Sequence, residues 1–232
     1  MEKYYSIAVD GPSGAGKSTL SRRCAKAFGF IYVDTGAIYR TIGLAAYRRG
    51  LNKENEAELM EMLPQLDIKM AYEDKGEQKM YLDGEDVSAQ IRLPEISTAA
   101  SQVSAHAKVR EYLLEMQRKM ARENNVIMDG RDIGTVVLPG AELKIFLTAS
   151  SEARAKRRFL ELQQKGIDTD FQQVLADIEK RDKNDSERAA APLKAAEDSI
   201  LVDTSQLDFE QSFNKLCEII SEKLNIKKTE DR

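Results

Sequence analysis

A glycine-rich segment near the N-terminus constrains the fold more than any other part of the sequence. It reads Gly11-Pro12-Ser13-Gly14-Ala15-Gly16-Lys17-Ser18 and fits the pattern G-x-x-x-x-G-K-S/T. It directly follows the apolar run Tyr5 to Val9 and opens a helical stretch from Lys17 to Phe28. In such a context the loop N–H groups surround phosphates, the lysine reaches the β- and γ-phosphates, and the serine hydroxyl binds Mg²⁺. A chance match is the alternative, and the placement between strand and helix argues against it.

We therefore predict a nucleoside triphosphate site, with Ser18 as a Mg²⁺ ligand. The residues predicted to bind ATP are Gly11, Pro12, Ser13, Gly14, Ala15, Gly16, Lys17, Ser18 and Thr19.

Short apolar runs alternate with helical patterns along the rest of the chain. After the first strand, strand-like runs are found at Phe30 to Val33, Val126 to Met128, Leu143 to Leu147 and Ile200 to Val202. Buried strands that alternate with helices predict an α/β fold: a five-stranded parallel sheet with helices on both faces. Helices are expected after Asp34-Thr35-Gly36 up to Gly50, over Glu54 to Leu63, from Pro94 onward, over Glu152 to Lys165 with Ser151 as N-cap, over Phe171 to about Arg188, and through Phe213 to Ile220.

One segment departs from this alternation. Asp67 to Tyr72 and Gln78 to Leu82 are strand-like and lie on either side of a turn-like stretch, residues 73–76. We predict a small antiparallel insert over Leu66 to Arg92. The stripe Val109, Leu113, Met116 and Met120 on the helical region after Pro94 is expected to be mostly core.

The length of 232 residues suits one domain. Its predicted parts are a core at residues 1–65, 94–150 and 190–225, an insert at 66–93, helices at 151–189 that form a lid, and a tail at 226–232.

Composition excludes several other classes of protein. The chain has 35 Lys+Arg against 39 Asp+Glu, a net charge of −4, so it lacks the basic character of a general nucleic-acid binder. It contains neither a long apolar span nor a signal-peptide pattern, and we expect a cytoplasmic protein. Cys24 and Cys217 are expected to be buried thiols, and the single histidine, His106, is not expected to do chemistry.

Two further segments follow strands at the same edge of the sheet. Asp34-Thr35-Gly36-Ala37-Ile38-Tyr39-Arg40 places a threonine N-cap and Arg40 at the start of a helix, which predicts a second anion site or, alternatively, a plain capped helix. Asp129-Gly130-Arg131-Asp132 follows a third strand. Asp129 can hold a metal-bound water there, Arg131 can meet phosphate, and Asp132 can accept from a base or ribose; a loop salt bridge is the alternative.

Arginines recur at helical spacing in the last third of the chain. Arg154, Arg157 and Arg158 share one face of a helix, and Arg181, Asp185 and Arg188 share one face of the next. Such stripes are usually solvated surface. These two helices can also close over the nucleotide, where guanidinium groups would neutralise a transferring phosphoryl group.

Several segments in order make the chain similar to the bacterial cytidylate kinases, within the nucleoside monophosphate kinase group of phosphate-loop proteins. The resemblance runs from about Ser6 to about Lys223. It rests on the Gly11 to Ser18 loop, the segments 34–40, 82–88, 100–104, 109–111 and 129–137, and Arg181-Asp182 with Asp185 and Arg188. The family often has serine where this chain has Thr35, which keeps the hydroxyl, and some relatives have glycine at the position of Ser18.

The resemblance implies roles for individual residues. It places Thr35, Arg40, Arg131 and Arg188 near the acceptor phosphate and cytosine, Ser101, Arg110 and Asp132 toward the base, and Arg181 with Asp185 toward the ribose; the insert belongs to the part that holds the monophosphate. The residues predicted to bind CMP are Thr35, Gly36, Arg40, Ser101, Arg110, Asp129, Arg131, Asp132, Arg181, Asp185 and Arg188. The predicted catalytic residues are Lys17, Arg131, Arg157 and Arg158.

The expected reaction is Mg²⁺-dependent transfer of the ATP γ-phosphoryl group to CMP or dCMP by a monomer that binds no nucleic acid and no membrane. Two alternatives stay open at this point. One is a small-molecule hydroxyl kinase with Asp34 or Asp132 as base, and the other is a nucleotide-dependent switch or RNA-associated protein. The insert and the many arginines argue against the first, and the acidic pI against the second.

Overall fold

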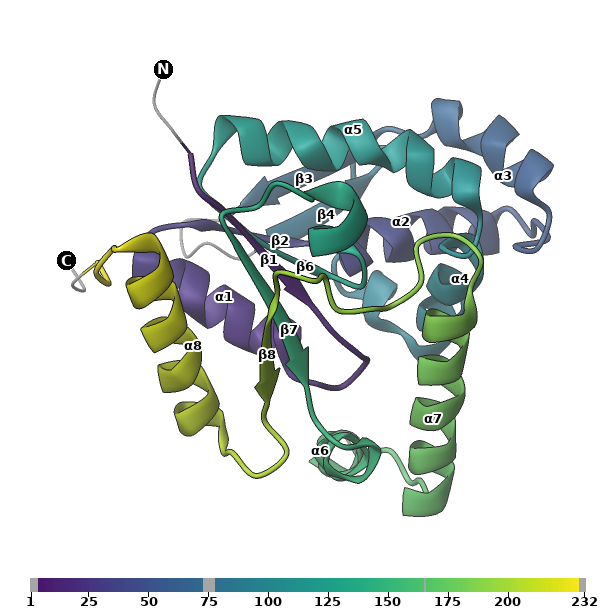
Figure 1. Cartoon of the computed structure of the whole chain (residues 1–232). Coiled ribbons are helices and arrows are strands. Elements are labelled where there is room, and N and C mark those ends of the chain that lie inside the picture. Colours follow the sequence, from purple (N-terminus) through teal and green to yellow (C-terminus); the bar gives the residue numbers. More distant parts are fainter. Residues whose placement is uncertain (1–3, 73–77, 165, 230–232) are drawn as a thin grey trace. The chain divides into compact units, whose positions relative to one another are not determined.

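A computed structural model describes residues 4–72, 78–164 and 166–229 (Figure 1). The chain forms two compact units. The first contains the chain up to Ile31 and from Asn124 onward, and the second contains Tyr32 to Glu123. The turn-like stretch expected at residues 73–76 lies outside the described residues.

A parallel sheet forms the centre of the first unit. Its strands are β1 (Ser6–Asp10), β6 (Val126–Gly130), β7 (Leu143–Thr148) and β8 (Ile200–Asp203). β1 pairs in parallel with β6 and β7, and β7 pairs in parallel with β8. β2 (Ile31–Asp34) follows β6 in the strand order β2-β6-β1-β7-β8, which confirms the predicted five-stranded sheet. β1 and β6 are almost wholly buried, as expected for their apolar runs Ile7 to Val9 and Val126 to Met128.

Helices pack on this sheet and beside it. α1 (Lys17–Phe28) packs on β1, β6 and α8 (Phe209–Leu224), and α8 also contacts β7. Cys24 and Cys217 on these two helices are buried and free, as predicted. α6 (Ser151–Gln164) and α7 (Phe171–Glu187) pack against each other through a small apolar cluster that includes Ala155 and Ile178. A short π-helical segment, η3 (Ile133–Val137), follows β6.

The second unit combines helices with the predicted antiparallel insert. Its helices are α2 (Thr35–Arg48), α3 (Glu56–Met62), α4 (Pro94–Val103) and α5 (Ala107–Glu123), with short 3₁₀ turns η1 (Leu63–Gln65) and η2 (Gln90–Arg92). β3 (Ile68–Tyr72), β4 (Gln78–Leu82) and β5 (Glu85–Asp86) form a three-stranded antiparallel sheet. One apolar core joins α2, α3, α4, α5 and β4, so the insert shares its interior with these helices.

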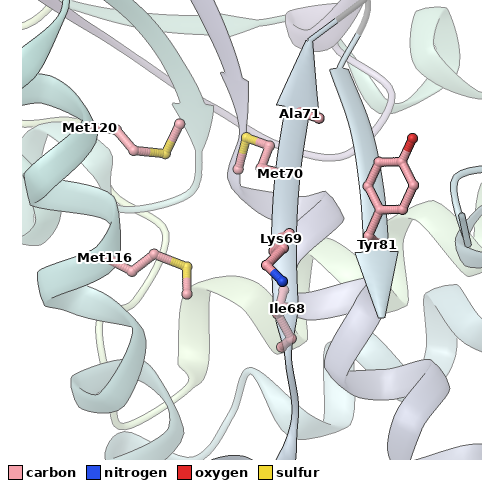
Figure 2. Close-up of a pocket in the computed structure, with 7 residues that line it drawn as sticks. All are labelled: Ile68, Lys69, Met70, Ala71, Tyr81, Met116 and Met120. Atoms are coloured by element: carbon pink, nitrogen blue, oxygen red, sulfur yellow. The ribbon is translucent and has the colours of Figure 1, made fainter. Parts of the chain in front are cut away.

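Part of the predicted apolar stripe on α5 is not core. Val109 and Leu113 are fully buried, but Met116 is 38% exposed. Met116 and Met120 line a groove of about 600 Å³ together with β3 residues such as Ile68 and Met70 (Figure 2). The expectation that the stripe is mostly core therefore holds for Val109 and Leu113 and not for Met116, because helical spacing identifies a face but not how far the neighbouring strand covers it.

Among the described residues, every helix is too short or too polar to cross a membrane.

Candidate active site

The phosphate loop connects β1 to α1 with a backbone that only glycine adopts easily. Gly11, Gly14 and Gly16 all have φ between 75° and 149°. A Cβ on Gly11 would lie 1.9 Å from the carbonyl oxygen of Leu147, and one on Gly14 would lie 3.3 Å from Cβ of Arg154. The loop is therefore held by β7 and α6 as well as by its own sequence. Gly16 precedes α1 and no side chain caps that helix, so the free N–H groups of its first turn are available to an anion.

Lys17 is buried at the start of α1. Its ammonium donates a hydrogen bond of 2.8 Å to the carbonyl oxygen of Pro12. The pKa of Lys17 is lowered to about 7, chiefly by burial and then by the positive charge of Arg131, while Asp129 and Asp10 oppose the change. The nearby carboxylates thus do not offset the cost of burying this ammonium, and such a group is suited to bind a polyanion.

Ser18 and Asp129 bring a hydroxyl and a carboxylate together at the end of the sheet. Ser18 Oγ donates to Asp129 Oδ2 at 2.9 Å, although the two residues are 111 positions apart. Mg²⁺ in nucleotide sites is held by one or two such oxygen ligands, by substrate phosphates and by water. The donor set therefore fits Mg²⁺ bound together with ATP. Among the residues that the structure describes, no cluster of three or more His, Cys, Asp or Glu side chains forms a metal site by itself.

Asp10 is a buried carboxylate that the sequence analysis did not select. It accepts hydrogen bonds of 2.7 Å from the backbone N–H groups of Ile133 and Gly134, at the start of η3. Burial raises the pKa of Asp10 to about 6 against the lowering effect of these two N–H groups. Asp10 thereby fixes the segment that follows Asp132. The one available signal was its position, a charged residue that ends an apolar strand.

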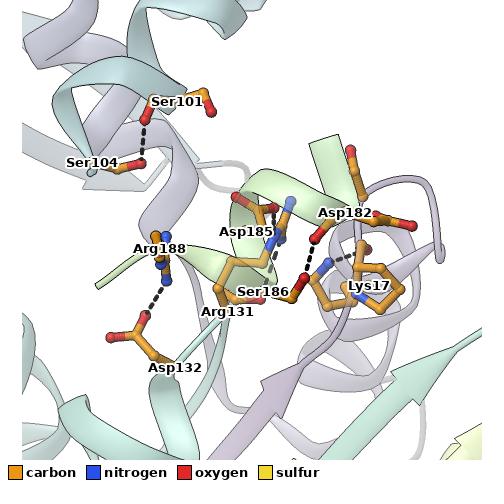
Figure 3. Close-up of polar contacts among 12 residues, drawn as sticks. Lys17, Ser101, Ser104, Arg131, Asp132, Asp182, Asp185, Ser186 and Arg188 are labelled. Carbon is orange, nitrogen blue, oxygen red and sulfur yellow. Dashed lines mark hydrogen bonds and ion pairs between the residues drawn. The ribbon is translucent and has the colours of Figure 1, made fainter. Parts of the chain in front are cut away.

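The residues predicted on α7 meet the loop after β6. Arg131 Nε donates to Asp185 Oδ2 at 2.8 Å, and Arg188 pairs with Asp132 at 3.7 Å (Figure 3). Burial by itself would raise the pKa of Asp185, but Arg131, Arg181 and Arg188 outweigh it and hold that pKa below its ordinary value. Asp185 is therefore a carboxylate surrounded by guanidinium groups, a network in which an incoming phosphate can replace one partner.

The three arginines of α6 have different surroundings. Arg157 donates to the carbonyl oxygens of Thr204 at 2.6 Å and Leu207 at 3.4 Å, in the loop between β8 and α8. Arg158 is half exposed and pairs with Glu161 at 2.9 Å. Arg154 is buried and contacts the phosphate loop, since it donates to the carbonyl oxygen of Ser13 at 3.0 Å. The spacing alone did not separate Arg154 from its neighbours.

In the second unit, the start of α2 is capped by Asp34 and not by Thr35. Asp34 has extended backbone angles and its carboxylate accepts from the N–H of Ala37 at 2.9 Å, whereas Thr35 is the first helical residue. The prediction of a threonine cap was therefore one residue too late. Asp34 also pairs with Arg40 at 2.7 Å, and its backbone N–H donates to the side chain of the buried Gln78 at 2.8 Å. Gly36 lies against this pair, because a Cβ there would be 3.1 Å from Arg40 and from Asp34.

Ser101 and Arg110 lie on α4 and α5 of the same unit. α2 and α4 approach closely at Gly43, where a Cβ would be 2.9 Å from the backbone nitrogen of Ala100. Arg110 donates to the carbonyl oxygen of Ser104 at 3.1 Å and lies 5.3 Å from the ring centroid of Tyr39, a residue of α2. Ser101 is half-buried on α4, and its carbonyl oxygen accepts from the Ser104 hydroxyl at 3.1 Å. An arginine, hydroxyl groups and an aromatic ring therefore lie on α2, α4 and α5 of this unit, whereas the groove at β3 in the same unit is mostly apolar.

The glycine loop, the buried lysine after it and the parallel sheet together define a phosphate-loop α/β protein. A protein of uncharacterised function from Eubacterium ventriosum shares the fold, with a TM-score of 0.50 at 14% identity over 95% of this chain and 99% of that one.

The family model for cytidylate kinase matches residues 7–222. A cytidylate kinase from Caldicellulosiruptor bescii is 51% identical over 94% of this chain and 96% of that protein, and one from Syntrophotalea carbinolica is 46% identical over 97% and 96%. The chain belongs to the cytidylate kinase family, which confirms the resemblance seen in the sequence and the predicted class of enzyme.

Proposed function

We propose that the protein transfers the γ-phosphoryl group of ATP to CMP or dCMP and releases ADP and CDP or dCDP. The observation that carries this proposal is the combination of family membership with a buried, incompletely compensated Lys17 beside the phosphate loop. Phosphoryl transfer needs positive charge and alignment more than it needs covalent chemistry. The first unit supplies positive charge from several directions.

On the ATP side, we assign Lys17 to the β- and γ-phosphates. To reach them its ammonium leaves the carbonyl oxygen of Pro12. Ser18 and Asp129 are the residues that would hold Mg²⁺, which supplies further neutralisation of the phosphate charge when it is bound. Arg157 and Arg158 on α6 are assigned to the closed, nucleotide-bound form as parts of the lid, where exclusion of water prevents hydrolysis of ATP.

On the acceptor side, a phosphate is already anionic and nucleophilic, so no general base is required. In the first unit, Arg131 and Arg188 are assigned to the acceptor phosphate, Arg181 and Asp185 to the ribose, and Asp132 to the base. When phosphate binds, Arg131 exchanges part of its interaction with Asp185 for the ligand.

In the second unit, Arg40, Thr35 and Gly36 are assigned to the acceptor phosphate, and Ser101 with Arg110 to the base. Asp34 orients Arg40 through their ion pair of 2.7 Å. The amino group of cytosine is a donor and its N3 and O2 are acceptors, so a carboxylate, a hydroxyl and an arginine complement its edge.

The test is a coupled assay of ADP formation with ATP and Mg²⁺, in which CMP, dCMP, UMP, AMP, GMP and no acceptor are compared. Turnover confined to the cytidine acceptors, with UMP well behind, is expected. Turnover with none of them, despite tight ATP binding, would overturn the proposal. We further propose that the enzyme acts as a monomer in the cytoplasm, which size-exclusion chromatography with light scattering and cell fractionation test.

A further inference from the structure

Arg154 is the most completely engaged arginine of α6. Its side chain donates to the carbonyl oxygen of Ala149 at 2.8 Å and to that of Ser13 at 3.0 Å, and it pairs with Asp182 at 2.6 Å. Its side chain is only 5% exposed. Arg154 thus connects three segments of the first unit: the end of β7, the phosphate loop and α7. The guanidinium is rigid and its N–H groups bond to all three segments. A displacement of one of these segments therefore acts on the other two through Arg154.

Two cations hold consecutive carbonyl groups of the phosphate loop. Lys17 binds the carbonyl oxygen of Pro12, and Arg154 binds that of Ser13. If Lys17 moves to the phosphates of ATP, as the proposed function requires, the Pro12 carbonyl loses its partner. The next carbonyl along the loop, that of Ser13, remains bonded to Arg154, so a movement of the loop at Pro12 acts on this side chain.

At its other end Arg154 holds α7 at Asp182. Oδ1 of Asp182 is buried and has no hydrogen-bond partner among the described residues, so the ion pair through Oδ2 is the main compensation of this carboxylate. Ser186 donates to the backbone carbonyl of Asp182 at 2.8 Å (Figure 3). Asp185, one turn further along α7, accepts from Arg131. The position of Asp182 therefore affects the neighbouring residues assigned to the acceptor.

We propose that the contact of Arg154 with Ser13 and Asp182 couples occupancy of the phosphate loop by ATP to the acceptor-binding residues of α7. Arg154 is a positioning residue in this scheme and contacts neither substrate. The inference rests on the proposed function, because it needs Lys17 to bind ATP and α7 to bind the acceptor. ATP and the acceptor each raise the affinity of the protein for the other, and the buried ion pair between Arg154 and Asp182 carries much of that effect.

The coupling is a thermodynamic quantity and is reciprocal. The factor by which ATP tightens the binding of CMP must equal the factor by which CMP tightens the binding of ATP. Typical coupling factors between sites are about 5 to 150, and we expect a factor of at least about 5 for the unaltered enzyme. If Arg154 carries the coupling, substitutions at either end of the ion pair reduce this factor toward about 1.

The experiment measures CMP affinity by titration calorimetry, with and without a saturating non-hydrolysable ATP analogue and Mg²⁺. The variants are Arg154→Met, Arg154→Lys, Asp182→Asn and the double variant Arg154→Met with Asp182→Asn. Lysine retains the charge but not the fork of donors, so it should give an intermediate factor. The matched controls are Lys156→Met on α6 and Asp177→Asn on α7, which remove one charge from each helix at exposed positions and should keep the unaltered factor.

The expected result is a large fall of the coupling factor in each single variant and no further fall in the double variant, since both changes break one link. Unaltered coupling in folded Arg154→Met and Asp182→Asn proteins would overturn the inference, even if both nucleotides bind more weakly. A factor of about 1 in the unaltered enzyme would overturn it as well.

Circular dichroism checks that each variant folds. If Arg154→Met does not fold, the coupling factors of Arg154→Lys and Asp182→Asn test the inference. Failure of the proposed function would be seen separately, because the unaltered enzyme would then show no CMP-dependent ADP formation in the coupled assay.

Discussion

Replacing Lys17 by methionine should stabilise the nucleotide-free protein while it abolishes turnover. Methionine has a similar length and no charge, so it can occupy the same buried space. The ammonium of Lys17 donates a hydrogen bond of 2.8 Å to the carbonyl oxygen of Pro12 in the phosphate loop. Burial of a charge with so little compensation opposes folding, and the site is retained for function.

The magnitude follows from the pKa. Burial, together with the nearby positive charge of Arg131, lowers the pKa of Lys17 from 10.5 to about 7. Each factor of ten in proton affinity corresponds to ~1.4 kcal/mol, so below pH 7 the charged form opposes folding by at most about 5 kcal/mol. Relaxation of the loop and imperfect packing of methionine reduce the measured gain. We expect Lys17→Met to raise the free energy of unfolding by about 1–3 kcal/mol at slightly acid pH.

The pH dependence has a defined sign. The unfolded chain keeps the lysine proton up to about pH 10.5, whereas the folded protein releases it near pH 7. Between these values the unfolded state binds more protons, so the stability of the unaltered protein rises with pH. Methionine does not titrate. The stability advantage of the variant should therefore be largest below pH 7 and should shrink as the pH rises toward about 9.

Urea unfolding at about pH 6.5 and about pH 9 in the absence of nucleotide measures both effects. Lys180→Met is the control, since Lys180 is an exposed lysine on α7. A variant less stable than the unaltered protein at both pH values, or an advantage that does not shrink with pH, would refute the reasoning on burial. Near-normal turnover by the folded variant would refute the assignment of Lys17 to the transferring phosphates.

Four further outcomes are expected from the geometry. Gly11→Ala should prevent ATP binding and lower the melting temperature by several degrees, because its Cβ would lie 1.9 Å from the Leu147 carbonyl oxygen. Fluorescence titration with a labelled ATP analogue measures the binding, and calorimetry measures the melting temperature. Asp34→Ala should destabilise by about 1–2 kcal/mol through loss of the helix cap, which urea unfolding will show. Arg110→Ala and Asp132→Ala should each raise KM for CMP more than KM for ATP, and equal increases for both substrates would contradict their assignment to the base.

Local signals were sufficient to predict most elements of the fold. The sequence predicted α1 and β4 at their observed boundaries, Lys17–Phe28 and Gln78–Leu82. The proline at position 94 correctly predicted the first residue of α4. The phosphate loop was predictable because its function requires glycines and a lysine at fixed spacing. All of these features depend on neighbours within a few residues.

Both predicted helix caps were one residue too late. Asp34 caps α2 where Thr35 was expected, and Ser150, which accepts from the N–H of Ala153 at 3.2 Å, precedes α6 where Ser151 was expected as the cap. In each case two adjacent polar residues can cap the helix. The residue type alone does not decide which of the two accepts the backbone N–H of the first turn.

Sequence by itself determined the class of site and the reaction type, because these follow from residue types at short, fixed spacing. Only the tertiary structure decided which arginine of α6 is buried. Arg154, Arg157 and Arg158 have the same charge and share a helix face, yet Arg154 alone of the three contacts Ser13, which is 141 positions away. A guanidinium is stabilised in the interior by acceptors from distant segments, and helical spacing does not identify those acceptors.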